Sequence, residues 1–233
     1  MIFFFADDHY QTRAGARIFA NLPGDLRYGS VFRENDFSLL ESGAWEPSCE
    51  LLVLHMIGGT CSLPHPGPGA EAAVKRYCAR KGPLLLLHGS SAAFWQWPWW
   101  RRITGMRWVR PKDPDGVERS VHPSAPCQVR RSKCRHPLAA RLVPFELPED
   151  EIYTALEQTG PLWTLLECDV NGRTFPQCTE SFTPWGGRVI NFLPGHRAEC
   201  VNSPGVVANV EILCRYLLSA PAADADAVPI SSL

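Results

Sequence analysis

Three histidines stand at or just beyond the ends of short apolar runs that are typical of buried strands. They are His9, His88 and His196. In an open α/β sheet, ligands bind outside the carboxyl ends of the strands, so side chains at such positions face a crevice and not the core. An imidazole changes its charge near neutral pH and also binds metal ions. These positions therefore favour general acid/base chemistry, and they make the same three histidines candidate metal ligands.

Carboxylates are supplied by the acidic run Glu149-Asp150-Glu151, which Tyr153 follows closely. A carboxylate beside an imidazole fixes its tautomer, raises its basicity, or acts as the acid or base itself. Asp150 and Glu151 therefore join the three histidines as candidate catalytic residues. The run has a second interpretation, because acidic residues after Pro148 also suit the positive end of a helix. The local sequence slightly favours this helix N-terminus.

Two serines follow the strand that ends at His88, where an α/β hydrolase would carry its nucleophile. A G-x-S-x-G elbow needs a glycine on each side of the serine, and His88 and Ala92 take those places. A serine hydrolase is therefore disfavoured, although it stays an alternative. Gly89, Ser90 and Ser91 are predicted to line the turn and to contact a ligand.

Five tryptophans crowd a short segment, namely Trp95, Trp97, Trp99, Trp100 and Trp108. Aromatic rings of this size bury large areas, so they suit core packing. Their flat faces also pack against the apolar face of a sugar ring, which would make the segment a carbohydrate platform. Both interpretations stay open at this point.

A second group of metal-ligand residue types lies in the middle of the chain: His122, Cys127, Cys134 and His136. Their spacing matches no compact C-x2-C arrangement, which disfavours a structural zinc site. A divalent metal held by the strand-end histidines and a carboxylate is favoured over it. No cofactor follows with certainty from the sequence, and a divalent metal is the one left open.

The elements that must position these side chains alternate between strand and helix in the first half of the chain. Two strand–helix–strand passages there favour right-handed parallel crossovers and a doubly wound sheet. Strands are predicted over residues 2–6, 26–32, 51–55, 83–87, 128–131, 162–168 and 188–193. Helices are predicted over residues 12–21, 70–81 and 205–218. The segment 110–124 is rich in proline and charge, which predicts a loop.

The composition is that of a globular domain of ordinary polarity. Of 233 residues, 45% are hydrophobic and 20% are charged, and the net charge is −1. We expect one α/β domain over residues 1–219 and a flexible tail over 220–233. The near-neutral charge argues against nucleic-acid binding, with a short basic run from Arg130 to Arg135 as the local exception.

The same composition bears on where the protein works. No apolar stretch approaches the roughly 20 residues that a membrane-spanning helix needs. Nine cysteines, most of them inside apolar runs, suit the reducing cytosol. A cytoplasmic protein is therefore expected, and a secreted disulfide protein is the alternative.

Several short motifs follow one another along the chain. They are Leu87-His88-Gly89 with Ser91-Ala92-Ala93-Phe94, Trp97-Pro98-Trp99-Trp100, Ile103-Thr104-Gly105-Met106, His136-Pro137-Leu138, Asp150-Glu151-Ile152-Tyr153, Pro184-Trp185, Gly187-Arg188-Val189 and Gly195-His196. As an ordered set they resemble the ThuA-like family, which is named for trehalose utilisation. The resemblance runs from the first strand to about Leu218, diverges over 111–134, and puts His9 where the family usually has a histidine.

The resemblance implies a three-layer α/β sandwich with a mainly parallel central sheet, of the flavodoxin-like or class I glutamine amidotransferase-like type. It also implies carbohydrate metabolism, in which the protein binds and transforms a sugar or keto-sugar derivative. Its partners would be a small sugar-like ligand and either a sugar dehydrogenase or a second copy of the chain, with no nucleic acid and no membrane. The implied substrate-binding residues are Gly89, Ser90, Ser91, Trp99, Trp100, His136 and Tyr153.

The sequence departs from true glutamine amidotransferases at two motifs. No cysteine follows the strand over residues 84–87, and His196-Arg197-Ala198-Glu199 does not give the expected H-x-E. Without a thiolate no glutaminyl thioester can form, so glutaminase activity is not expected. The alternative to an enzyme is a non-catalytic module of this fold that binds a ligand or a partner. A metal-assisted or serine hydrolase is the third alternative.

Overall fold

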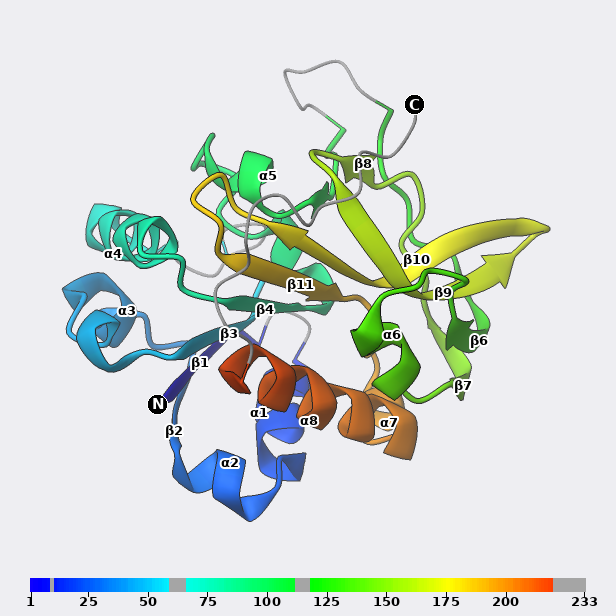
Figure 1. Ribbon diagram of the computed structural model, residues 1–233, viewed down its shortest axis with the longest axis horizontal. Helices are drawn as coiled ribbons and strands as arrows, with labels where there is room; N and C mark the ends of the chain where they lie inside the picture. The colour runs from blue at the N-terminus through cyan, green and yellow to red at the C-terminus, as the bar shows by residue number, and fades with distance from the viewer. Residues whose placement is uncertain (9–10, 59–65, 112–117, 220–233) are drawn as a thin grey trace.

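A nine-stranded sheet forms the middle layer of the computed structural model, which describes residues 1–8, 11–58, 66–111 and 118–219 (Figure 1). Its strand order is β2-β1-β3-β4-β11-β10-β9-β6-β7. In chain order the strands are β1 (Ile2–Ala6), β2 (Ser30–Glu34), β3 (Leu51–His55), β4 (Leu84–Leu87), β6 (Ser124–Arg131), β7 (Phe145–Glu151), β9 (Leu162–Val170), β10 (Arg173–Phe182) and β11 (Arg188–Phe192). The two-residue strands β5 (Met106–Arg107) and β8 (Glu157–Gln158) pair separately.

The first half of the sheet is parallel. Strands β2, β1, β3, β4 and β11 all pair parallel, in the order 2-1-3-4-11. Numbered within this half, that is the 2-1-3-4-5 order of doubly wound flavodoxin-like sheets, whose ligands bind at the carboxyl ends near the β1/β3 switch point. The parallel crossovers expected from the first 90 residues are therefore present.

The second half of the sheet is antiparallel, so the sheet as a whole is mixed. Strands β11, β10, β9, β6 and β7 pair antiparallel along the sheet. The expectation of a mainly parallel sheet is not confirmed. The reason is a long hairpin: Asn171 and Gly172 both adopt positive φ between β9 and β10. A tight turn of this kind joins antiparallel strands only.

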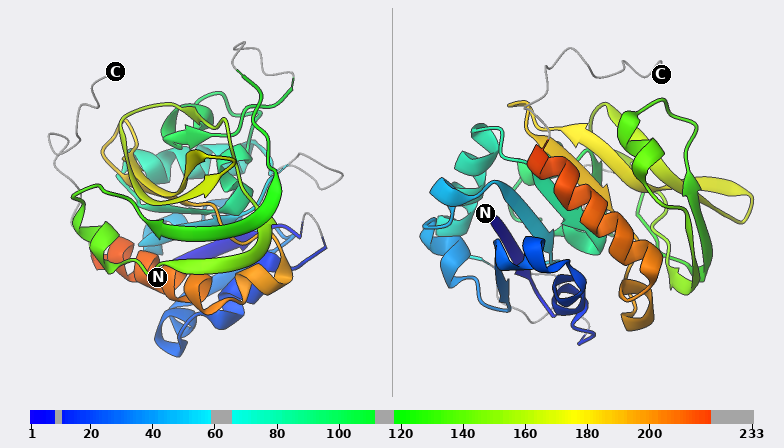
Figure 2. Two further views of the ribbon diagram at one scale, coloured as in Figure 1. Left: turned by 90° about the vertical axis from the view of Figure 1, so that its right-hand side faces the viewer. Right: turned by 60° about the horizontal axis from the view of Figure 1, so that its bottom comes forward.

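Helices cover both faces of the sheet (Figure 2). One face packs α1 (Ala14–Asn21), α2 (Gly24–Tyr28), α6 (Pro137–Arg141), α7 (Ala198–Val201) and α8 (Pro204–Ser219). The other face packs α3 (Ser38–Ser42), α4 (Pro68–Ala79), α5 (Trp100–Ile103) and the short 3-10 helix η1 (Glu46–Ser48). Each face has its own hydrophobic core: Phe4 belongs to the first, and Phe3 and Phe5 to the second. Burial on both faces explains why β1 reads as a continuous apolar run.

Several predicted elements change in the structure. The helices predicted over 12–21, 70–81 and 205–218 correspond to α1, α4 and α8, whereas the segment 26–32 divides between α2 and β2. The acidic run Glu149-Asp150-Glu151 ends a strand and begins no helix, so the helix N-terminus was the wrong interpretation. Backbone pairing decides this, because Glu151 lies opposite Ser124 and Asp150 opposite Ala125.

Two expectations concern the chain as a whole. The predicted tail over 220–233 lies outside the described residues. Among the helices that the structure describes, none combines the length and the apolarity that crossing a bilayer requires.

We expect Leu85→Ala to lower the free energy of unfolding by about 2–5 kcal/mol, because it leaves a cavity in the centre of β4. Leu85 is fully buried between β3 and β11. The matched control is Leu218→Ala on α8, since Leu218 is 38% exposed and its loss should cost less than about 1 kcal/mol. Urea denaturation of both variants measures the difference, and equal losses would contradict the packing described.

Candidate functional site

The turn after β4 presents His88 at the carboxyl edge of the sheet. His88 opens the 3-10 helix η2 (His88–Ala92), and its φ is +50°, a left-handed value that residues other than glycine seldom adopt. A strained strand-to-helix turn of this kind is the backbone of a nucleophile elbow, which lifts one side chain above the sheet. Here the raised side chain is the imidazole of His88, and not Ser90, which stands at the serine position of the G-x-S-x-G comparison. The motif G-x-S-x-G is absent, but a turn of the elbow type is present.

Gly89 allows this turn to pack closely. A Cβ placed on Gly89 would lie 2.9 Å from Ile57 Cδ1 and 3.3 Å from the Tyr153 hydroxyl oxygen. Glycine is therefore required to keep Tyr153 next to His88. Gly89 is better described as a residue that makes room for the site than as one that contacts a ligand.

The His88 ring lies at the centre of a cluster of polar groups. It is 3% exposed, and its Nδ1 lies 2.9 Å from the Leu193 carbonyl oxygen. A carbonyl only accepts hydrogen bonds, so Nδ1 carries the proton and Nε2 of the neutral ring is an acceptor. Nε2 lies 2.9 Å from the Tyr153 hydroxyl and 3.1 Å from His196 Nδ1.

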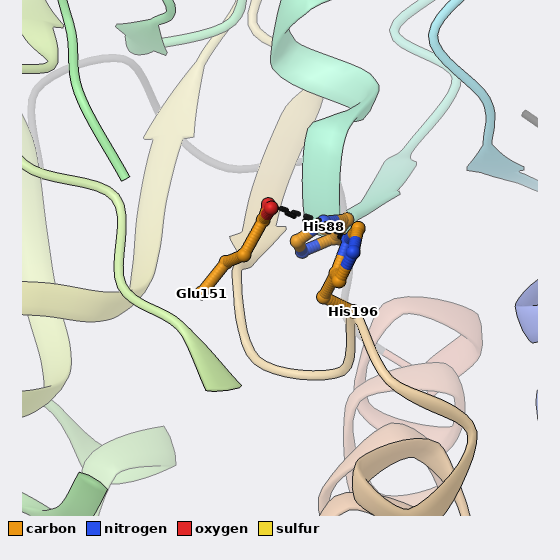
Figure 3. Close-up of side chains that lie close together, drawn as sticks. All are labelled: His88, Glu151 and His196. Atoms are coloured by element: carbon orange, nitrogen blue, oxygen red, sulfur yellow. Dashed lines mark hydrogen bonds and ion pairs between the residues drawn. The ribbon is translucent and has the colours of Figure 1, made fainter. Parts of the chain in front are cut away.

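Glu151, the last residue of β7, brings its carboxylate to the two imidazoles (Figure 3). Its Oε2 lies 3.6 Å from His88 Nε2 and 3.4 Å from His196 Nδ1, and its Oε1 lies 3.2 Å from His122 Nδ1. Burial alone would raise the pKa of Glu151, but the nearby His88 ring and its interactions with His196 and His122 lower it below its usual value. Burial and the neighbouring His88 lower the pKa of His196.

Asp150 supports this cluster through hydrogen bonds with the backbone next to His196. Its carboxylate is 1% exposed and accepts hydrogen bonds from the backbone N–H of Gly195 at 2.7 Å and of His196 at 3.0 Å. Both oxygens are thus engaged with the loop that follows β11. Asp150 therefore positions His196.

Two further residues, Trp108 and His122, complete the site. Neither was predicted for it from the sequence. The Trp108 ring lies 4.9 Å from the Tyr153 ring and 5.4 Å from the His122 ring, centroid to centroid. A bridge between Val121 and Thr154, and the pairing of Ser124 with Glu151 at the start of β6, bring His122 to the site. No local pattern distinguishes His122 in the sequence, because these long-range pairings place it near Glu151.

A small cavity lies beside the cluster, at the carboxyl ends of β1, β3 and β4. Its lining includes Asp7, His55, Ile57, His88 and His196. Its volume of about 10 Å³ admits about one water molecule. The cavity therefore suits a hydroxyl, a carbonyl oxygen or a water next to His88, and a larger ligand would extend toward the open side.

The structure gives the contacts of other residues that were predicted for the site. The Ser90 hydroxyl donates to the carbonyl oxygens of Leu54 and Leu87, each at 2.8 Å, and so holds the turn together. Ser91 is buried, and no partner for its hydroxyl is found among the described residues. Trp100 is fully buried in the second core, and the indole N–H of Trp99 donates to Glu71. Core packing is thus the observed role of Trp100, and the prediction for His9 lies outside the described residues.

His136 belongs to a different cluster on the face covered by α6 and α8. It caps the N-terminus of α6, where its Nδ1 accepts a hydrogen bond from the Leu138 N–H, and its Nε2 lies 3.3 Å from Glu180 Oε2. Glu180 is fully buried and also accepts hydrogen bonds from Arg188 and Tyr216. The structure does not bring His136 to His88.

We expect Asp150→Ala to destabilise the protein by about 1–3 kcal/mol or more, because two buried backbone N–H groups lose their acceptor. Hydrogen exchange should also accelerate at the amides of Gly195 and His196, which tests the two bonds directly. The control is Glu149→Ala, whose carboxylate is half-exposed and bonds Ser124 and Arg197. Unchanged exchange at both amides in Asp150→Ala would contradict the positioning role.

The His136 cluster predicts a pH-dependent stability. Burial is the main cause that lowers the pKa of His136; Glu180 opposes the shift and Arg188 adds to it. The unfolded chain therefore takes up its proton first as the pH falls, so this contribution is complete above pH about 6.5 and declines below it. His136→Asn should show a shallower loss of unfolding free energy between pH about 7 and 5. If the unfolding free energies of the two proteins fall in parallel as the pH is lowered, His136 has no part in the pH dependence.

Comparison with known proteins agrees with the fold. Residues 62–212 match the model of the ThuA family, described as trehalose utilisation. A ThuA-like protein from Parabacteroides merdae superposes with a TM-score of 0.73 at 15% identity, covering 94% of this chain and 90% of that one. A ThuA-like protein from Bacteroides uniformis gives 0.64 at 15%, covering 93% and 91%. A cytoplasmic protein from Salmonella typhimurium gives 0.61 at 11%, covering 93% and 98%.

These structural similarities show the fold alone. No curated protein matches the sequence. The family model spans well over half of the chain, from before α4 into α8. The chain therefore belongs to the ThuA family.

Proposed function

We propose that this protein is an enzyme of carbohydrate metabolism that moves protons on a sugar or keto-sugar derivative. One observation carries the proposal: a second imidazole, a carboxylate and a phenol converge on His88 Nε2 at distances of 2.9–3.6 Å. This convergence lies at the carboxyl edge of the sheet, beside a cavity large enough for one oxygen atom and its hydrogens.

The arrangement supports general acid/base chemistry. An imidazole that takes up a proton next to the Glu151 carboxylate is stabilised by that negative charge. Tyr153 offers a hydroxyl that can donate to a developing negative charge on a substrate oxygen. His122 contacts the same carboxylate from its exposed side, 3.2 Å from Oε1. Both a proton acceptor and a proton donor are therefore present within one small volume.

The substrate class follows from the family and from this chemistry. A hydrogen on the carbon next to a keto group is acidic, so a keto-sugar can exchange or shift it by proton transfer alone. Removing that proton leaves the electron pair on the enediolate oxygen, and a proton returned to carbon restores the ketone. A keto-sugar arises when a sugar hydroxyl is oxidised, which is the reaction of a partner sugar dehydrogenase. Trp108 offers a flat aromatic face next to Tyr153 for the sugar ring.

Other activities of related folds receive less support from the site. A glutaminase would need a thiol at the elbow, where this chain has His88. A serine hydrolase would need a serine bonded to histidine, and the Ser90 hydroxyl bonds backbone groups. A purely binding module would have its ionisable groups scattered around an aromatic pocket, and here His88, His196 and Glu151 converge.

The test is hydrogen exchange on candidate substrates in D2O. Proton NMR follows the loss of the signal from the carbon next to the carbonyl in a panel of keto-glucosides and keto-trehalose. We expect enzyme-dependent exchange, slowed about 10²–10⁴-fold in Glu151→Gln and His196→Asn. The matched control is Glu149→Gln, an adjacent carboxylate that lies outside the cluster. Exchange at the same rate in Glu151→Gln, or none on any keto-sugar, would refute the proposal.

A further inference from the structure

The three side chains at the centre of the site form a triangle with the dimensions of a metal site. Their facing atoms are His88 Nε2, His196 Nδ1 and one oxygen of Glu151, and they are 3.1, 3.4 and 3.6 Å apart. Ligand atoms around an ion with bonds of about 2.0–2.2 Å lie about 3.3–3.6 Å apart in a tetrahedral arrangement. The triangle therefore needs little adjustment to accept an ion.

The imidazole of His88 has the orientation of a metal ligand. Its Nδ1–H donates to the Leu193 carbonyl, so the lone pair of Nε2 points toward the cluster. A metal-binding histidine almost always donates its other ring N–H to a carbonyl or carboxylate in this way. The positive φ of His88 fixes the same orientation from the backbone side.

More polar groups lie around His88 Nε2 than this one atom can bond. Nε2 of the neutral His88 ring accepts one hydrogen bond, yet the Tyr153 hydroxyl, His196 Nδ1 and Glu151 Oε2 all lie within 3.6 Å of it. The carboxylate oxygen is itself an acceptor and cannot bond to that lone pair. A cation between the three groups would contact both nitrogens and the oxygen at once.

The burial of the three side chains and the access to them also fit a metal site. His88 is almost fully buried, while Glu151 and His196 keep a minor exposed fraction on one side. The small cavity reaches both histidines and leaves room for one water or substrate oxygen next to them. Three protein ligands with an open position are the pattern of catalytic metal sites, and two histidines with one carboxylate suit zinc and other divalent transition metals.

We propose that His88, His196 and Glu151 bind one divalent transition-metal ion of the Zn²⁺ or Mn²⁺ kind. Such an ion polarises a carbonyl or a bound water when it is present. Tyr153 and His122 would then be the proton-carrying groups around it. A role of the ion in turnover rests on the proposed function, whereas its binding is measured independently of any substrate.

The test is metal titration of the tag-free protein after treatment with a chelator. Calorimetry with Zn²⁺ and with Mn²⁺ should show one ion per chain. Co²⁺ should give the visible absorption of a nitrogen- and oxygen-ligated site, without a thiolate charge-transfer band. Glu151→Gln and His196→Asn should each weaken binding about 100-fold or more, while Glu149→Gln and His136→Asn should retain it. Circular dichroism of each variant shows whether it has folded. If His196→Asn does not fold, Glu151→Gln, which conserves the shape of the side chain, still tests the metal site.

Three results would overturn the metal site: no binding in the unmodified protein, equal binding in Glu151→Gln, or a cobalt–thiolate band. The exchange assay on keto-sugars, run on the chelator-treated protein with and without added ion, separates the two proposals. Specific metal binding without exchange on any keto-sugar supports the metal site and refutes the proposed function. Full exchange in protein that binds no ion refutes the metal site and supports the function.

Discussion

The buried carboxylate of Asp150 joins two parts of the sheet that lie far apart in strand order. It sits near the end of β7, an edge strand, and accepts hydrogen bonds from the loop after β11, which is four strands away. The twist and curvature of the antiparallel half bring that edge back over the carboxyl ends of the parallel strands (Figure 2). Because Glu151 is the next residue, the same contact delivers its carboxylate to His88 and His196.

The elbow after β4 shows how one fold supports different chemistry. Its strained backbone raises whichever side chain stands first in the turn, here His88. With an imidazole there, the turn supplies a nitrogen that binds a proton or a metal ion and supplies no nucleophile for acyl transfer. The hydroxyl of Ser90, two residues later, is used to tie the turn to Leu54 and Leu87. The chemistry of the site thus depends on one residue whose backbone the fold has already fixed.

Much of the parallel half of the fold was predictable because β1, β3 and β4 are buried on both faces and lack an alternating polar pattern. The same pattern placed His88 and His196 at strand ends, where topology brings them together. The antiparallel half carries a weaker signal: β10 contains Pro176, Gln177 and Glu180, and it was not among the predicted strands. The site residues Trp108 and His122 lie outside the nine-stranded sheet, just after β5 and just before β6, and distant pairings place them. His136 has the right side chain, but its sequence could not show that it caps α6 and faces Glu180.

The division of the sheet also has an evolutionary consequence. The imidazoles come from the turn after β4 and the loop after β11, which both belong to the parallel half. His122 and the Trp108–Tyr153 pair come from connections outside that half, where insertions are tolerated best. A descendant of this chain could therefore acquire a new substrate by remodelling those connections while the reactive centre stays in place. The dipeptide Asp150-Glu151 would tie such innovation to the parallel half.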